Sequence, residues 1–228
     1  MSHGQLVFRD VHKRFADVEV LRGLSAQVPL SGLTFLVGKS GSGKSVLCRL
    51  AVGLLHADGG EIDFDGEPVH ALTPRKRRAL RAKAPYLVQG PALLDWRTVE
   101  DNVALAAQTA PNAHFRAQEA LARLGLSELG KRFPPSIGPG QAKRVALARA
   151  LVLSPRYLLL DEPTTGLDAQ AAAQVNEAIL EIARSGLGAL VVSHDYRALA
   201  AMADRVLVVA EGKAAFLGAR EEFLSSWA

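Results

Sequence analysis

The chain has 228 residues, of which 49% are hydrophobic and 22% are charged, and its formal net charge is +4. This length and composition favour a globular protein with one substantial core and room for a smaller attached subdomain. Its apolar runs are far shorter than the roughly 20 residues that span a bilayer, and the N-terminus lacks an apolar signal-peptide region. We therefore expect a soluble protein whose membrane role, if it has one, is peripheral. The single cysteine, Cys48, excludes an internal disulfide and Cys-rich metal sites.

The first apolar strand is predicted at residues 34–37, and a Gly/Ser-rich loop follows it. The loop consists of Gly38, Lys39, Ser40, Gly41, Ser42, Gly43, Lys44 and Ser45, and Val46 continues into a helical run at residues 46–54. Such a strand–loop–helix pattern predicts phosphate binding, because the glycines let successive N–H groups face phosphate oxygens at the helix N-terminus. Lys44 would contact the β and γ phosphates and Ser45 would bind Mg²⁺. A plain Gly/Ser-rich turn is the alternative.

Two features precede the next core strand. Ile62 and Phe64 alternate with acidic residues before Gly66, which predicts a half-exposed antiparallel strand that ends in a turn. A basic run then occupies residues 75–83. This run is either a solvated helix face or a patch for lipid headgroups or nucleic acid.

A short strand at residues 86–88 ends at Gln89, whose amide could approach Mg²⁺ and an attacking water. Strand patterns are then missing up to residue 154, and helical spacing appears at residues 99–108, 115–124 and 141–153. This stretch is predicted to be an inserted helical subdomain. A loop is expected before its last helix, where prolines and glycines gather: Pro134, Pro135, Gly138, Pro139 and Gly140.

Three further apolar strands are predicted at residues 157–160, 189–192 and 205–210, which indicates a buried, largely parallel sheet. The first of them is followed by Asp161 and Glu162. Asp161 could hold Mg²⁺ through water, and Glu162 could polarise the attacking water as a general base. His194 follows the second strand, at a strand end where catalytic groups of α/β proteins collect. Near the N-terminus, Phe15 could stack on an adenine ring or simply fill the core.

Taken in order, these residues resemble the motifs of the ABC ATPase family across essentially the whole chain. Phe15 is similar to the adenine-stacking aromatic, residues 38–45 to the Walker A loop, and Gln89 to the Q-loop glutamine. Residues 158–161 resemble Walker B, Glu162 its catalytic glutamate, Asp168 a D-loop residue, and His194 the switch histidine.

The resemblance implies an α/β fold with a RecA-like P-loop NTPase core and an N-terminal antiparallel β subdomain, formed by residues 1–88 and 156–228. The helical subdomain is expected at residues 89–155. ATP and Mg²⁺ are the implied cofactors. The implied metal ligands are Ser45, Gln89 and Asp161, and the implied catalytic residues are Lys44, Gln89, Glu162 and His194.

Members of this family work as dimers, with ATP held between the Walker A loop of one subunit and the signature loop of the other. That loop usually reads Leu-Ser-Gly-Gly-Gln, whereas residues 137–141 read Ile-Gly-Pro-Gly-Gln here. Gly138, Gly140, Gln141 and Asp168 are the residues expected to contact nucleotide in this arrangement. Because Gly138 lacks a hydroxyl and Pro139 lacks an N–H, slow turnover is expected.

A closer resemblance, to ATPases of Mla/Mce-type phospholipid and solvent-resistance transporters, is carried by residues 42–47 and 89–104. It implies a subunit that energises lipid transport. The expected partners are a second ABC ATPase subunit, identical or not, and a transmembrane permease that docks at residues 90–102, from Gly90 to Asn102; no nucleic acid is expected. This implies a cytoplasmic subunit bound to the inner face of the cell membrane.

Two other classes of function stay open at this point. One is a soluble ABC protein that acts on nucleic acid or ribosomes, for which the basic run at residues 75–83 is the only support. The other is a nucleotide-binding regulator with little turnover, which the altered signature loop favours.

Overall fold

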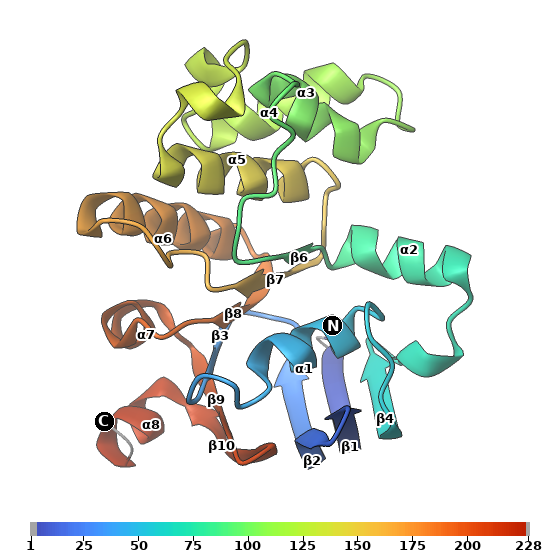
Figure 1. Ribbon diagram of the computed structural model, residues 1–228. Coiled ribbons are helices and arrows are strands. Elements are labelled where there is room, and N and C mark those ends of the chain that lie inside the picture. The colour runs from blue at the N-terminus through green and yellow to red at the C-terminus, as the bar shows by residue number, and fades with distance from the viewer. Residues whose placement is uncertain (1–3, 227–228) are drawn as a thin grey trace.

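The computed structural model describes residues 4–226, which form two β-sheets with helices on both sides (Figure 1). The strands are β1 (Gln5–Phe15), β2 (Val18–Pro29), β3 (Leu33–Val37), β4 (Gly59–Phe64), β5 (Glu67–Pro68), β6 (Tyr86–Leu87), β7 (Tyr157–Asp161), β8 (Gly188–Val192), β9 (Arg205–Ala210) and β10 (Lys213–Ala219). The α-helices are α1 (Lys44–Ala51), α2 (Pro74–Lys83), α3 (Val99–Ala104), α4 (Ala113–Arg123), α5 (Pro139–Leu151), α6 (Ala169–Arg184), α7 (Tyr196–Met202) and α8 (Arg220–Ser226). Short 3₁₀ turns are η1 (Val69–Ala71), η2 (Leu105–Ala107), η3 (Ser127–Leu129) and η4 (Pro134–Ser136).

The larger sheet has the strand order β10-β9-β3-β8-β7-β6. Its neighbouring strands are parallel except for β10, which pairs antiparallel with β9. The five apolar strands predicted from the sequence are β3, β6, β7, β8 and β9, and each differs from its prediction by at most one residue at an end. The predicted parallel sheet is therefore confirmed.

The smaller sheet is antiparallel, with the order β2-β1-β4-β5. Ile62 and Phe64 of β4 are buried while Glu61 is exposed, and the chain turns at Asp65 and Gly66 into β5. This is the half-exposed antiparallel strand that the alternating pattern predicts. The long strands β1 and β2 complete the predicted β subdomain.

Hydrophobic cores cover both faces of the larger sheet, because successive residues of a strand point to opposite faces. In β7, Leu158 and Leu160 join the core that includes residues of α5 and α6, whereas Tyr157 and Leu159 join the core shared with α1 and the smaller sheet. All five residues of β7 are buried. Such complete burial explains why this strand is continuously apolar up to its final aspartate.

Helices α3, α4 and α5 lie together at one end of the molecule, and the smaller sheet lies at the opposite end (Figure 1). They fill the chain between β6 and β7, where the helical spacing placed them. One local prediction was wrong: Pro139 and Gly140 begin α5 instead of extending the loop before it. Proline is well suited to the first helical position, because its missing N–H would have no partner within the helix there. No helix in the described part of the chain has the length and apolar character needed to cross a membrane.

Candidate functional site

Four core strands deliver candidate residues to one edge of the larger sheet. β3 leads into the Gly/Ser-rich loop, β7 ends with Asp161, β8 is followed by His194, and β6 precedes Gln89. These strands are neighbours in the order β3-β8-β7-β6 and run parallel. Their carboxyl ends therefore meet at the same edge, where ligands of open α/β sheets bind.

The loop between β3 and α1 requires glycine at two positions. Gly38 has a φ of 150° and Gly43 a φ of 101°. A Cβ on Gly38 would lie 2.2 Å from the carbonyl oxygen of Val209, and a Cβ on Gly43 would lie 2.8 Å from Cδ2 of Leu21. A side chain at either position would displace the loop from its seat between β9 and β2.

Lys44 begins α1 inside this loop and is 5% exposed. Its Nζ donates to the carbonyl oxygens of Gly38 and Lys39, each at 2.9 Å. Burial lowers the pKa of the Lys44 amine, and the nearby carboxylates of Glu162 and Asp161 oppose that lowering. The loop therefore encloses a cation where the sequence pattern predicts phosphate groups.

Asp161 is 5% exposed and accepts hydrogen bonds from two hydroxyls. Ser45 Oγ donates to Asp161 Oδ1 at 3.0 Å, and the Tyr86 hydroxyl donates to Oδ2. Burial and the hydrogen bond to Asp161 raise the pKa of Tyr86, so the phenol remains a donor. Tyr86 was not among the residues predicted for this site. The available signal was its position at the start of the strand before Gln89, since Tyr86 pairs with Leu159 of β7.

Glu162 contacts the predicted histidine directly. Its Oε1 lies 2.9 Å from Nε2 of His194, and its Oε2 accepts a hydrogen bond from Oγ1 of Thr165 at 2.7 Å. His194 was predicted as a catalytic residue at the end of its strand, and its imidazole lies against the Glu162 carboxylate. A glutamate held by a histidine at the end of a strand is an arrangement that can orient a general base.

The donor atoms beside Asp161 fit a magnesium ion. The Ser45 hydroxyl and the Asp161 carboxylate supply hard oxygen ligands of the kind that Mg²⁺ prefers. Within the described residues, no group of three or more His, Cys, Asp or Glu side chains forms a metal site. A sparse set of this kind suits Mg²⁺, which usually keeps several waters and takes further ligands from substrate phosphates.

Gln89 is exposed, and among the described residues its side-chain amide forms no hydrogen bond with Ser45 or Asp161. Its backbone carbonyl instead accepts a hydrogen bond from Nζ of Lys143 on α5. Arg149 of the same helix donates to the next carbonyl oxygens of this loop, those of Pro91 and Ala92. Neither cation was predicted from the sequence, because more than fifty residues separate each of them from the loop that it holds.

Phe15 lies at the end of β1 and is 43% exposed. The alternative interpretation, a core aromatic, is therefore wrong. Nζ of Lys13 lies 5.3 Å from the centroid of the Phe15 ring. Stacking of adenine on this exposed ring stays a prediction.

The signature-loop residues lie at the start of α5, on the opposite side of the larger sheet from α1 (Figure 1). Gly138 is the N-cap, and its N–H donates to Oε1 of Gln141 at 3.0 Å. A Cβ on Gly140 would lie 2.8 Å from Cβ of Ala171. The structure therefore accounts for Gly140 by close packing on α6, and for Gln141 by helix capping.

Asp168 is the N-cap of α6, where its Oδ1 accepts a hydrogen bond from the N–H of Ala171 at 2.8 Å. This contact satisfies one of the unpaired N–H groups at the helix start. The nucleotide contacts expected of Asp168, Gly138, Gly140 and Gln141 in a dimer stay predictions.

A family model described as ABC transporter matches residues 21–165. The chain belongs to the ABC transporter family. It is 42% identical over 203 residues to the aliphatic sulfonates import ATP-binding protein SsuB 2 of Agrobacterium fabrum, a match that covers 88% of this chain and 74% of that protein. It is 40% identical over 211 residues to the SsuB protein of Mycobacterium avium, covering 90% of this chain and 77% of the other. Among solved structures, cbiO1 from Clostridium perfringens, part of the ABC transporter complex cbiONQ, gives a TM-score of 0.90 at 27% identity and covers 99% of this chain and 92% of its own.

The protein is thus an ATP-binding, ATP-hydrolysing subunit of an ABC transporter, and the predicted ABC ATPase fold is confirmed. The predicted closer relation to Mla/Mce-type lipid transporters was wrong, because relatives that match about nine-tenths of the chain are named for aliphatic sulfonate import. That prediction rested on two segments, residues 42–47 and 89–104. The first belongs to the Walker A loop, whose sequence is constrained by phosphate binding whatever compound is transported, and the second is a short stretch that begins at Gln89. The alternative of a protein acting on nucleic acid or ribosomes is not favoured by these relatives.

Proposed function

We propose that this ABC ATPase energises the import of an aliphatic sulfonate through a separate membrane permease. The observation that carries the proposal is its 42% identity, over 88% of the chain, to a protein named for aliphatic sulfonate import. The ATPase itself contacts phosphate and its partners, so the identity of the cargo is inferred from relatives and not from the ATP site.

Within the ATP site, we assign Lys44 to the β and γ phosphates and Ser45 with Asp161 to Mg²⁺. Bound Mg²⁺ would neutralise charge on the phosphates. Glu162 is assigned as the general base for the attacking water, and the 2.9 Å contact with His194 supports this role because it orients one carboxylate oxygen. Thr165 holds the other oxygen.

The partner subunit in this proposal is a second ABC ATPase chain that completes the site. Signature residues at the start of α5 lie on the other side of the sheet from Lys44, so one chain does not bring them together. A facing subunit would supply Gly138, Gly140 and Gln141 to the nucleotide. The resulting dimer would bind a permease from the inner face of the membrane.

Permease docking is proposed at residues 90–102, where a preformed loop presents Trp96. Trp96 is 74% exposed, whereas Leu94 is half-buried and Leu93 packs on the core. The side chain of Asn102 holds the loop in this conformation. Its Oδ1 accepts a hydrogen bond from the Leu94 N–H at 2.7 Å, and its Nδ2 donates to the carbonyl oxygens of residues 94, 97 and 98. Trp96 is thus the large apolar side chain that this loop exposes.

The docking proposal is tested by Trp96→Glu, with Phe115→Glu as the matched control. Phe115 is also an exposed aromatic, at 60%, but lies on α4. Trp96→Glu should keep basal ATP hydrolysis and lose co-purification with membranes, while the control keeps both. Membrane association of a folded Trp96→Glu protein would remove this loop from the proposal.

The cargo proposal is tested by uptake of labelled ethanesulfonate in the source cells. Replacement of the native protein by its Glu162→Gln variant should abolish this uptake and leave sulfate uptake unchanged. Arg78→Gln, a change on an exposed helix face, is the control and should preserve both. Normal ethanesulfonate uptake in cells with Glu162→Gln would overturn the assignment.

A further inference from the structure

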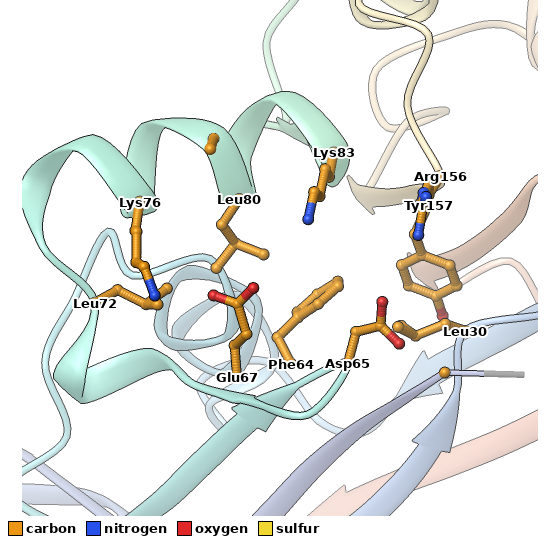
Figure 2. A pocket seen from close by; sticks show the side chains of 12 residues that line it. Leu30, Phe64, Asp65, Glu67, Leu72, Lys76, Leu80, Lys83, Arg156 and Tyr157 are labelled. Carbon is orange, nitrogen blue, oxygen red and sulfur yellow. The ribbon is translucent and has the colours of Figure 1, made fainter.

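A second pocket lies between α2, the turn from β4 to β5 and the start of β7 (Figure 2). Its volume is about 330 Å³, within the range of roughly 300–1,000 Å³ for clefts that bind small ligands. The pocket reaches the first residue of β7, whereas Asp161 stands at the last. It shares no lining residue with the ATP site.

The floor of this pocket is apolar. It is formed by Phe64, Leu72 and Leu80, each less than a tenth exposed, and by the buried ring of Tyr157. Phe64 and Tyr157 meet edge to face with their ring centroids 6.4 Å apart. Leu80 is the one buried residue of the strongly basic helix α2. The floor is therefore a rigid apolar surface suited to an aliphatic or aromatic group.

The rim carries charges of both signs. Lys76 and Lys83 extend from α2 and Arg156 precedes β7, while Asp65 and Glu67 flank the turn between β4 and β5. Figure 2 shows the Lys83 amine and the two carboxylates turned toward the space between the helix and the strands. Among the described residues, none of these five side chains forms an ion pair or a side-chain hydrogen bond.

We propose that this pocket binds a small zwitterion with an apolar body, of the class of hydrophobic α-amino acids. Its carboxylate would lie near Lys83 and Arg156, its ammonium near Asp65 and Glu67, and its side chain on Phe64 and Leu80. Charge-assisted hydrogen bonds of this kind are about twice as strong as neutral ones. A ligand with only one charge would leave either the cations or the carboxylates of the rim without an opposite charge. Those groups would then face an apolar group or a like charge, which is unfavourable.

The site joins two segments that continue into the ATP site. The N–H of Arg156 donates to the carbonyl oxygen of Lys83 at 2.8 Å, and the N–H of Leu159 donates to that of Pro85 at 3.0 Å. A ligand between Lys83 and Arg156 would thus bridge the end of α2 and the start of β7. The proposal is independent of which compound the permease carries.

Binding is tested by calorimetric titration of the nucleotide-free protein with three probes that share a phenyl body. L-Phenylalanine carries both charges, 3-phenylpropanoate only the anion and 2-phenylethylamine only the cation. L-Phenylalanine should bind saturably at millimolar concentration or below. Each single-charge probe should bind at least about tenfold more weakly, which corresponds to about 1.4 kcal/mol. L-Leucine and L-methionine extend the test to other apolar bodies.

Pocket variants locate the binding. The affinity for L-phenylalanine should fall at least about tenfold in each of three variants, Lys83→Gln, Arg156→Gln and Asp65→Asn. Two control variants change exposed residues of α2 outside the pocket, Arg75→Gln and Arg78→Gln. They should bind L-phenylalanine as the unmodified protein does. Asparagine tolerates the φ of 55° at position 65. Unchanged ATP hydrolysis without probe verifies folding of every variant. Three results would overturn the proposal: none of the zwitterions L-phenylalanine, L-leucine and L-methionine binds saturably, the three phenyl probes bind with equal affinity, or the pocket variants bind L-phenylalanine as the two control variants do.

Discussion

At the scale of single residues, Glu162 adopts a backbone conformation that is uncommon for a side chain of its kind. Its φ is 49°, which costs on the order of 1–2 kcal/mol outside glycine. Three contacts hold it there: the N–H donates to the carbonyl oxygen of Val192 at 2.9 Å, and the two carboxylate oxygens meet His194 and Thr165. A carboxylate that is held through both of its oxygens is oriented before nucleotide binds.

Glu162→Gln should keep ATP binding and lower the hydrolysis rate by about 10²–10⁴, the usual contribution of a general base. The amide has nearly the same shape but accepts no proton. Steady-state phosphate release measures the rate, and equilibrium nucleotide binding is the control for folding. Hydrolysis at the unmodified rate would show that Glu162 is not the base.

Half-buried Tyr86 and fully buried Tyr157 give a pair of hydroxyl deletions. Tyr86→Phe removes a donor from the Asp161 carboxylate and should lower the free energy of unfolding by about 1.5–3 kcal/mol. The Tyr157 hydroxyl is buried beside Thr34, and neither hydroxyl forms a hydrogen bond of regular geometry among the described residues, so Tyr157→Phe should cost less stability than Tyr86→Phe. Urea denaturation of both variants measures the difference. Equal destabilisation would contradict the role assigned to Tyr86.

At the scale of elements, α5 connects the loop after β6 to the signature residues at its own start. Lys143 and Arg149 hold three carbonyl groups of residues 89–92, and Gly138 begins the same helix. A permease that displaces this loop would therefore pull on α5, and with it on the residues that face the second subunit.

Arg149→Gln should release the loop from α5 and lower the free energy of unfolding by about 1–3 kcal/mol, because two carbonyl groups lose a charged donor. Arg149→Gln should lower the permease-induced increase in the ATP hydrolysis rate more than it lowers the hydrolysis rate of the isolated protein. Arg78→Gln is the control, since Arg78 is an exposed cation on α2, outside the proposed docking loop. An Arg149→Gln protein with full permease stimulation would show that this contact does not transmit docking.

Replacement of Gly138 by Ser together with Pro139 by Gly should raise ATP turnover in the dimer. The change restores a hydroxyl and an N–H that a facing subunit could direct at the γ-phosphate, and loss of one such donor costs about 10²–10³ in rate. Turnover is measured in the isolated protein and in the reconstituted complex. A folded double variant that dimerises with ATP yet turns over no faster in either would show that the altered loop is not rate-limiting.

Elements differ in how well the sequence predicts them. β3, β7 and β8 are buried along their whole length, so continuous apolar runs revealed them. β1 and β2 were not recognised individually, because bulges interrupt their alternation. Their pairing shifts register between Phe8 and Val11, and Asp10 takes a φ of 50°. Periodicity is lost where a strand contains such extra residues.

At the scale of the whole molecule, the order of motifs along the chain predicted which side chains meet at the ATP site. These side chains lie at the ends of three separate strands: Lys44 after β3, Asp161 and Glu162 at β7, and His194 after β8. Parallel pairing brings those strand ends to one edge. Tyr86 and Arg149 escaped prediction because their contacts join distant parts of the chain through packing of α5 and β6 on β7. The position of Tyr86 in the strand before Gln89 was a local signal, but no local pattern shows which distant groups Tyr86 and Arg149 contact.

Asn102 gives the free subunit a thermodynamic advantage in assembly. Ordering one backbone residue costs roughly 1–2 kcal/mol of conformational entropy, and the four hydrogen bonds of this buried amide have already ordered the loop below Trp96. A permease that meets the preformed loop incurs less of that cost on association. If the permease docks at this loop as proposed, a side chain that is itself buried would contribute to the affinity of the complex.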